Sequence, residues 1–375
     1  MEKPLMNSPV LFEELEAAQG KVGRITLNVP ATLNALTLEM VDLLQAQLDA
    51  WAEDEAIAAV FVQGSGEKAF CAGGDVQALH ASALAQPGGP CEYAETFFAR
   101  EYRMNYTLHR YPKPLVCWGH GIVMGGGLGV MAACSHRVVT ERTRIAMPEV
   151  GIALFPDVGG SWFLNHTPGK SGEFLALTGA SVNAADAIYI GIADRFIASE
   201  HKDAVIRQLL EQRWSGDCVG NHARVRHVLR PYAQQSIAAW PAGQVEPHIA
   251  RINALCDGDD IHAIIDNITS QNTDDPWLAR GRDSLAYGSK LAALWIHRQL
   301  WETRHASLRE VFQSEIQLVS NVVRYPEFAE GVRALLIDKD RSPAWQYTSS
   351  RDIPVELLEN FFKAPWDVNP LAALN

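Results

Sequence analysis

The fold class follows from residues 24–63, which read RITLNVPATLNALTLEMVDLLQAQLDAWAEDEAIAAVFVQ. Arg24–Asn28 alternates polar and apolar residues and predicts a strand. Thr37 can cap a helix that follows the loop. The predicted buried stripe of this helix consists of Met40, Leu44, Leu48 and Trp51. Ala58–Gln63 is a short apolar run typical of a buried strand. Such a strand–helix–strand unit favours a parallel sheet with right-handed crossovers.

The alternation of strand, turn and helix continues along the chain to about Ile197. Beyond Glu200 the apolar residues recur mostly at helical spacing, with a polar interruption over Ser270–Pro276. We therefore predict an α/β core over residues 1–200 that carries the functional site. Residues 201–375 are predicted to form a mainly helical C-terminal region that covers the site or mediates assembly.

The bulk composition excludes several classes of protein. Of the 375 residues, 47% are hydrophobic and 20% are charged, which is ordinary for a globular protein. No uncharged apolar stretch is long enough to span a bilayer, so no membrane partner is expected. The net charge of −12 argues against non-specific nucleic-acid binding. An anionic substrate is still compatible with this net charge, because backbone N–H groups at the start of a helix can bind phosphate even in an acidic protein.

The cysteines and the first residues of the chain predict a cytoplasmic location. The six cysteines form neither a CxxC pair nor a cluster with zinc spacing, so we expect no metal site. Cysteines of this kind are typical of reduced thiols that serve as small apolar residues. Glu13, Glu14 and Glu16 argue against a secretory signal and against a transit peptide.

Two glycine-rich turns are candidates for binding a developing negative charge. They are Ala72-Gly-Gly-Asp75 and Met124–Gly129, the second at the start of an apolar run. Glycines let backbone N–H groups approach a ligand, and a pair of convergent N–H groups stabilises the oxyanion of a reacting thioester. A plain turn at the first site and close helix–strand packing at the second are the alternatives.

Two carboxylates in a mostly apolar stretch are candidates for acid–base chemistry. Glu149 follows Pro148, and Asp157 follows Pro156 eight residues later. Partial burial would raise the pKa of Glu149 and suit it to proton transfer. Both acids could instead be solvated, or Asp157 could cap the helix after Gly159–Gly160. Glu101, on a predicted amphipathic helix over residues 92–110, is by itself typical of a solvated side chain.

Five segments together resemble the crotonase (enoyl-CoA hydratase/isomerase) superfamily, and within it the hydrolases of 3-hydroxyisobutyryl-CoA. They are FCAGGD (70–75), HGIVMGGGLG (120–129), AMPEVGIALFPDVGG (146–160), LALTG (175–179) and EFAEGVRALLIDKDRSPAW (327–345). Each segment alone is a weak signal, but their order along the chain is specific. The resemblance implies a spiral of repeated β-β-α turns.

The resemblance also implies roles for individual residues. The N–H groups of Gly74 and Gly126 correspond to the oxyanion hole, and Glu149 and Asp157 to the catalytic acids. The implied substrate-binding residues are Glu101, Gly73, Asp75, Ala35 and Leu36, the last two in a loop near the CoA. CoA is part of the substrate, and neither a metal nor a redox cofactor is expected.

One departure from the family pattern separates the possible reactions. Typical hydratases use two glutamates, and the second would fall at Gly129, which has no side chain to move a proton. The resemblance therefore favours hydrolysis of a short 3-hydroxyacyl-CoA, 3-hydroxyisobutyryl-CoA above others, as in valine breakdown. A hydratase or isomerase, and an inactive acyl-CoA-binding protein, are the alternatives. Family members often form trimers or hexamers, so a homo-oligomer is expected.

Overall fold

The computed structural model describes residues 8–374. Their contacts divide them into two compact units, each built from separate stretches of the chain. Unit 1 contains the residues up to Gly74, then Met104–Ile145 and Val182–Gln244, and unit 2 contains Asp75–Arg103, Ala146–Ser181 and the residues from Val245 onward. Both units combine segments from the two sides of residue 200, and the predicted boundary there stays a prediction.

In the described part of the chain, the strands form a six-stranded and a three-stranded sheet. The larger sheet has the order β1 (Val10–Glu16), β2 (Lys21–Leu27), β3 (Ile57–Gly64), β5 (Leu115–Gly119), β7 (His136–Val139), β9 (Arg195–Phe196). The smaller has the order β4 (Ala69–Cys71), β6 (Ile122–Met124), β8 (Arg144–Ala146). Only the pairing of β1 with β2 in the larger sheet is antiparallel within the described residues.

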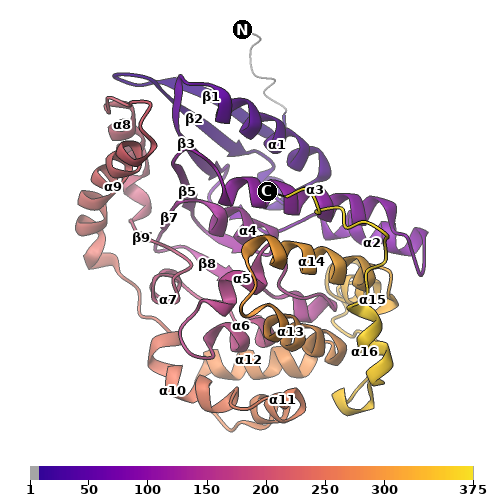
Figure 1. The fold of residues 1–375 in the computed structure, drawn as a ribbon. Helices are drawn as coiled ribbons and strands as arrows, with labels where there is room; N and C mark the ends of the chain where they lie inside the picture. The colour runs from indigo at the N-terminus through magenta and orange to yellow at the C-terminus, as the bar shows by residue number, and fades with distance from the viewer. Residues whose placement is uncertain (1–7, 375) are drawn as a thin grey trace. The chain divides into compact units, whose positions relative to one another are not determined.

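The order of the strands confirms the predicted spiral. After β2, each turn of the chain adds one strand to the larger sheet, then one to the smaller sheet, and then a helical connection. Successive strands of the larger sheet therefore follow one another from β1 to β9 (Figure 1). The predicted strand–helix–strand unit is present as β2, α1 (Leu38–Glu53) and β3, with β2 and β3 parallel. Thr37 caps α1 by accepting the N–H of Met40, and the four predicted stripe residues are buried.

α8 (Lys202–Leu210) and α9 (Cys218–Gln235) cover one face of the larger sheet in unit 1, and α1 and α4 (Gly126–Ala133) pack on the other. The helices of this unit also include α7 (Ala184–Tyr189). α8 contacts β2, and α9 contacts β3 and β9. Apolar side chains of α8, α9 and the sheet, among them Phe61, Trp118 and Leu209, form a continuous buried core with Trp214, which lies between the two helices. Burial of such large apolar side chains is the main stabilising term of a domain.

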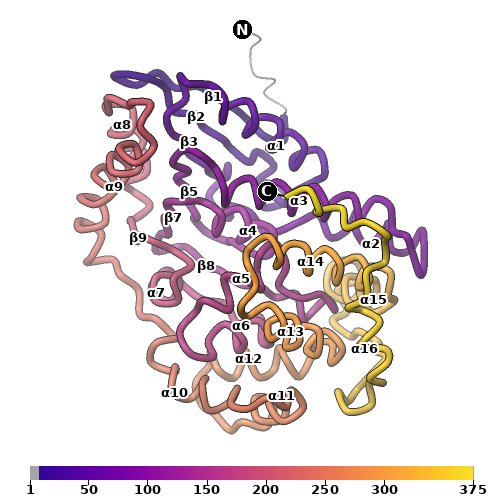
Figure 2. Tube along the Cα trace, viewed as in Figure 1, coloured from indigo at the N-terminus to yellow at the C-terminus, as the bar shows by residue number. Residues whose placement is uncertain are grey.

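Unit 2 is mostly helical, as predicted for the C-terminal part. Its helices are α2 (Val76–Ala85), α5 (Gly160–Asn165), α6 (Ser171–Thr178), α10 (Val245–Leu255), α11 (Ile261–Ser270), α12 (Pro276–Tyr287), α13 (Lys290–Thr303), α14 (Leu308–Val323), α15 (Pro326–Val332) and α16 (Val355–Phe361). Figure 2 follows the chain through α10 to α16, from salmon to yellow. α3 (Glu92–His109) gives its first residues to unit 2 and its last to unit 1. No helix among the described residues is long and apolar enough to cross a membrane.

A single buried amide ties together the loops around β4 in unit 1. The Asn34 side chain accepts the N–H of Val29 at 2.9 Å. Its amide nitrogen lies 3.0 to 3.2 Å from the carbonyl oxygens of Ser65, Ala69 and Phe70. Asn34 is fully buried. The Asn34 amide thus holds the loop that precedes α1 against Ser65, just after β3, and against Ala69 and Phe70 of β4, the strand that leads into the first glycine turn.

This arrangement predicts a large loss of stability for Asn34→Asp. The carboxylate would retain the acceptor for Val29 but would face three carbonyl oxygens with no proton to donate. We expect the free energy of unfolding to fall by about 3 kcal/mol, measured by urea denaturation. The same change at the exposed Asn272 should alter the free energy of unfolding by no more than about 0.5 kcal/mol. An Asn34→Asp protein as stable as the Asn272 control would show that the amide does not hold these loops.

Candidate active site

The two glycine-rich turns of the sequence lie beside each other in unit 1. The first follows β4 and the second follows β6, and these strands are parallel neighbours in the smaller sheet. The carboxyl ends of parallel strands meet at the same edge, which brings the two turns together. A Cβ added to Gly73 would lie 3.3 Å from the Met124 carbonyl oxygen and 3.7 Å from the Gly126 nitrogen. With a φ of +114°, Gly73 also has a conformation that other residues rarely adopt.

The N–H groups predicted for the oxyanion hole are available in both turns. Gly126 is the first residue of α4, and the preceding Gly125 has a φ of +48°. The first N–H groups of a helix have no intrahelical acceptor. Among residues 8–374, no hydrogen-bond acceptor is found for the N–H of Gly74 or of Gly126. Each N–H can therefore donate to a ligand without first breaking a bond within the protein.

The loop predicted to pass near CoA is fastened to the first glycine turn. The Leu36 N–H donates to the Gly73 carbonyl oxygen at 2.8 Å, and the Ala72 N–H donates to the Leu33 carbonyl oxygen at 3.0 Å. The Leu36 side chain is buried, whereas Ala35 is half-buried. In unit 2, Asp75 caps α2, because its carboxylate accepts the N–H of Ala78 at 3.2 Å.

Five carboxyl groups are buried in unit 2: Glu101, Glu149, Asp157, Glu315 and Glu327, with exposed fractions of 2, 6, 4, 0 and 3%. Three of them were candidates from the sequence, and the alternatives that placed these acids in solvent are wrong. Carboxyl groups are almost never fully buried unless they have a partner, because burial strongly disfavours the charged form. A set of buried carboxyl groups in one unit is typical of a functional site.

Asp157 lies in a strained turn and has one strong hydrogen bond. The Tyr102 hydroxyl donates to its Oδ2 at 2.6 Å. The next residue, Val158, has a φ of +53°, a costly conformation for a β-branched side chain. The alternative that Asp157 caps α5 is wrong, because Gly159 is the N-cap and the N–H of Ser161 in the first turn donates to Glu315 instead.

Burial raises the pKa of each of the three predicted acids. For Asp157 burial raises it to about 6, although the Tyr102 hydrogen bond opposes the change. The pKa values of Glu149 and Glu101 lie well above the usual range, first because of burial and second because of the charge of Asp157. Within the described chain, Oε2 of Glu149 and Oε1 of Glu101 have no hydrogen-bond partner. These acids thus retain a proton to a higher pH than an exposed carboxyl group does, and Glu149 and Glu101 can still accept a bond from a substrate.

The sequence interpretation missed Glu315 and Tyr102. The two carboxylate oxygens of Glu315 accept the N–H groups of Gly159 and Ser161 at 2.7 and 2.9 Å. A signal for Glu315 was present in the sequence, since it occupies the apolar stripe of α14 between Val311 and Val319. An acid at such a position is rare unless it has a buried partner. No comparable signal distinguished Tyr102 from an ordinary core tyrosine.

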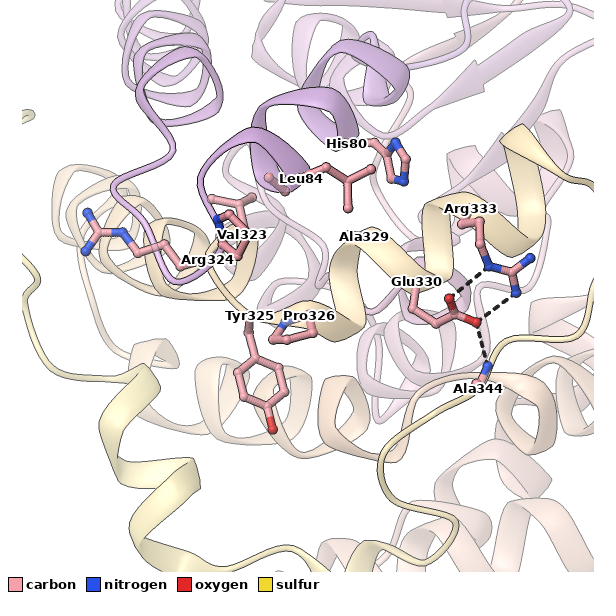
Figure 3. A pocket seen from close by; sticks show the side chains of 12 residues that line it. His80, Leu84, Val323, Arg324, Tyr325, Pro326, Ala329, Glu330, Arg333 and Ala344 are labelled. Atoms are coloured by element: carbon pink, nitrogen blue, oxygen red, sulfur yellow. Dashed lines mark hydrogen bonds and ion pairs between the residues drawn. The ribbon is translucent and has the colours of Figure 1, made fainter.

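Unit 2 also contains a pocket of about 410 Å³ between α2 and α15. Figure 3 shows His80 and Leu84 of α2 facing Ala329 of α15 across it. The two guanidinium groups at its wall are already paired: Arg324 with Glu95, and Arg333 with Glu330. Its lining therefore suits an apolar chain better than a phosphate group.

Comparison with known proteins decides the family. The family model described as "Enoyl-CoA hydratase/isomerase" matches residues 22–362. The chain belongs to the enoyl-CoA hydratase/isomerase family. This confirms the predicted resemblance to the crotonase superfamily. In this family the chain is 37% identical to "3-hydroxyisobutyryl-CoA hydrolase, mitochondrial" of Danio rerio, over 95% of this chain and 90% of the relative. It is 36% identical to the protein of the same name from Homo sapiens, over 94% of this chain and 89% of the relative.

Solved structures of the enoyl-CoA hydratase/isomerase family share the fold over nearly the whole chain. A carnitinyl-CoA dehydratase from Mycobacterium thermoresistibile superposes with a TM-score of 0.84 at 34% identity, covering 97% of this chain and 98% of that one. An enoyl-CoA hydratase from Rhodobacter sphaeroides 2.4.1 superposes with a TM-score of 0.82 at 33% identity, covering 96% and 98%. The predicted fold class, with its helical C-terminal region, is confirmed.

The raised pKa of Asp157 predicts how stability depends on pH. Because the pKa is about 6 in the folded protein against an ordinary value of 3.8, the native state holds this proton more tightly than the unfolded chain. The contribution to stability is complete below pH 4 and is lost as the pH rises through 6. Asp157→Asn removes the titration. Relative to the wild type, its free energy of unfolding should therefore rise by about 3 kcal/mol between pH 4 and pH 7. Urea denaturation at both pH values measures this, and a difference independent of pH would contradict it.

Proposed function

We propose that this protein hydrolyses the thioester of a short 3-hydroxyacyl-CoA, with 3-hydroxyisobutyryl-CoA as the first candidate. Water cleaves the bond between the acyl carbon and sulfur, giving 3-hydroxyisobutyrate and free CoA, a step of valine breakdown. Relatives that carry this hydrolase name are 36 to 37% identical to the chain over most of both lengths. The chemistry of the candidate residues supports the same reaction.

The observation that carries the proposal is the pairing of Glu149 and Asp157 as buried acids in a chain that has Gly129 at the second hydratase position. Both acids are buried in unit 2, and the charge of Asp157 raises the pKa of Glu149, as expected for neighbours. Gly129 lies within α4 and offers no group that could donate or accept a proton. Two-glutamate hydration therefore has no second acid, whereas hydrolysis needs one base and groups that orient the water or the substrate hydroxyl.

In the proposed mechanism, the N–H groups of Gly74 and Gly126 stabilise the negative charge that develops on the thioester oxygen. Donors of this kind contribute about 3 kcal/mol each to the transition state. Glu149 either removes a proton from the attacking water or attacks the acyl carbon itself. Both routes need its ionised form, so the raised pKa of Glu149 predicts a rate that increases with pH. Asp157 and Glu101 orient the water or the 3-hydroxyl group.

The second candidate is hydration or isomerisation of an enoyl-CoA. The names of the two solved structures described above favour it, since one is a carnitinyl-CoA dehydratase and the other an enoyl-CoA hydratase. Turnover of crotonyl-CoA without release of thiol would identify this reaction.

The remaining parts of the proposal concern partners and location. We propose that the reaction uses no metal or redox cofactor, that CoA is part of the substrate, and that the protein forms a trimer or hexamer. We also propose a cytoplasmic location, as predicted from the sequence. The relatives described above are named mitochondrial, so the compartment must be determined directly.

The first experiment follows thiol release from 3-hydroxyisobutyryl-CoA with a thiol-reactive dye. Wild-type protein should release CoA, and Glu149→Gln should lower kcat by about 10²- to 10⁴-fold, because the amide can act neither as a base nor as a nucleophile. Asp157→Asn should also lose activity. Crotonyl-CoA serves as the control substrate. Full thioesterase activity in both variants would contradict the proposal.

A second experiment tests the N–H of Gly126. Gly126→Pro removes the N–H group at the first position of α4, where proline is tolerated. We expect kcat to fall by about 10²- to 10³-fold. Gly126→Ala is the matched control, because it adds a Cβ but retains the N–H. Equal activity of the two variants would show that this N–H does not stabilise the transition state.

A further inference from the structure

Glu315 makes a contact in unit 2 that no predicted role explains. It lies on the buried side of α14 with an exposed fraction of 0%. Its Oε2 accepts the N–H of Gly159 at 2.7 Å, and its Oε1 accepts the N–H of Ser161 at 2.9 Å. One carboxyl group thus binds the residues on either side of Gly160, at the point where α5 begins.

The two N–H groups that Glu315 binds belong to the strained turn that carries Asp157. Between Asp157 and Gly159, the chain passes through Val158 at a φ of +53°, and the Gly160 N–H then returns to the Asp157 carbonyl oxygen at 2.6 Å. A buried valine does not retain this conformation unless its surroundings hold it there. The Glu315 carboxyl supplies such a restraint, because it binds the backbone immediately after the strained residue.

The helix that carries Glu315, α14, also restrains the side chain of Asp157. Phe312, three residues before Glu315 on α14, packs against the ring of Tyr102, with the centroids 5.8 Å apart. The Tyr102 hydroxyl donates to Asp157 Oδ2. α14 therefore acts on Asp157 through two routes, the backbone after it and the tyrosine that binds its side chain.

We propose that Glu315 is a positioning residue for Asp157: it holds the 157–161 turn so that the Asp157 carboxyl group stays aimed at the reacting group. This inference rests on the proposed function for the role of Asp157 in turnover. Glu315 itself binds backbone N–H groups of the turn and is no catalytic residue.

The electrostatic surroundings agree with a role close to Asp157. Burial raises the pKa of Glu315 to about 8, the N–H groups of Gly159 and Ser161 oppose this, and the charge of Asp157 adds to it. The other titratable groups that interact with Asp157 are Glu101 and Tyr102 on α3 and Glu149. Glu315 differs from these three groups because it accepts two backbone N–H groups of the turn.

The test compares Glu315→Gln with a matched control, Glu327→Gln. Glutamine has one acceptor oxygen, so one of the two N–H groups loses its partner and the turn can relax. Glu327 is also buried in unit 2 and also accepts two hydrogen bonds, from Ser289 and from the Gln346 N–H, but none from the 157–161 turn. Glu315→Gln should lower kcat by about 10- to 100-fold with KM changed less than about twofold. Glu327→Gln should lower the thermal midpoint without this loss of kcat.

A double-mutant cycle with Asp157→Asn separates positioning from general destabilisation. If Glu315 acts through Asp157, adding Glu315→Gln to Asp157→Asn should lower kcat by less than about twofold, because the group being positioned is already gone. Two outcomes overturn the inference. One is a full additional loss in the Asp157→Asn background, and the other is a Glu315→Gln protein with wild-type kcat and only reduced stability.

If Glu315→Gln cannot be purified folded, Glu315→Asp replaces it in the cycle, since it retains two acceptor oxygens but withdraws them by one methylene. The cycle is measured on whichever reaction the wild-type protein catalyses, thiol release from 3-hydroxyisobutyryl-CoA or hydration of crotonyl-CoA. Absence of thiol release by the wild type would therefore reject the proposed hydrolase alone, whereas additivity in the cycle would reject the role of Glu315 alone.

Discussion

The arrangement of unit 1 depends on one constraint, that parallel strands cannot be joined by a tight turn. Each strand of the larger sheet must be followed by a long connection before the next parallel strand is added. The chain uses these connections to build the smaller sheet, so β4 and β6 become parallel neighbours. The glycine turns after them then emerge at one edge. The proximity of Gly73 to Gly126 is thus a consequence of strand connectivity rather than of any attraction between the turns.

Unit 2 must bury a set of four carboxyl groups, those of Asp157 and of the three acids whose pKa values the charge of Asp157 raises. Each group is stabilised only in part: Asp157 by one hydroxyl and Glu315 by two N–H groups, while Glu101 and Glu149 each retain an oxygen without a partner in the described chain. A core selected for stability alone would replace such groups by apolar side chains, because incompletely paired buried charges are costly. Their retention agrees with the proposed site, which must bind a polar group and move a proton.

The sequence interpretation succeeded where local pattern was sufficient. The strand–helix–strand unit and the Thr37 cap are present as predicted. It was insufficient for the surroundings of the acids. Judged by itself, Glu101 was expected to be solvated, and Asp157 had a helix cap as its alternative, yet both are buried. Whether a polar residue on a helix is buried depends on what packs against it, and those partners come from distant parts of the chain.

The sequence by itself determined the elements, the glycine turns with their spare N–H groups and, through the order of its motifs, the family. These follow from local periodicity, from the backbone freedom of glycine and from the order of residues along the chain. Only the tertiary structure decided that Tyr102 and Glu315 hold Asp157 and its strained turn, although they lie 55 and more than 150 residues away in sequence. No local rule predicts such contacts, because hydrogen bonds and burial depend on distances in space, and these exist only once the chain has folded.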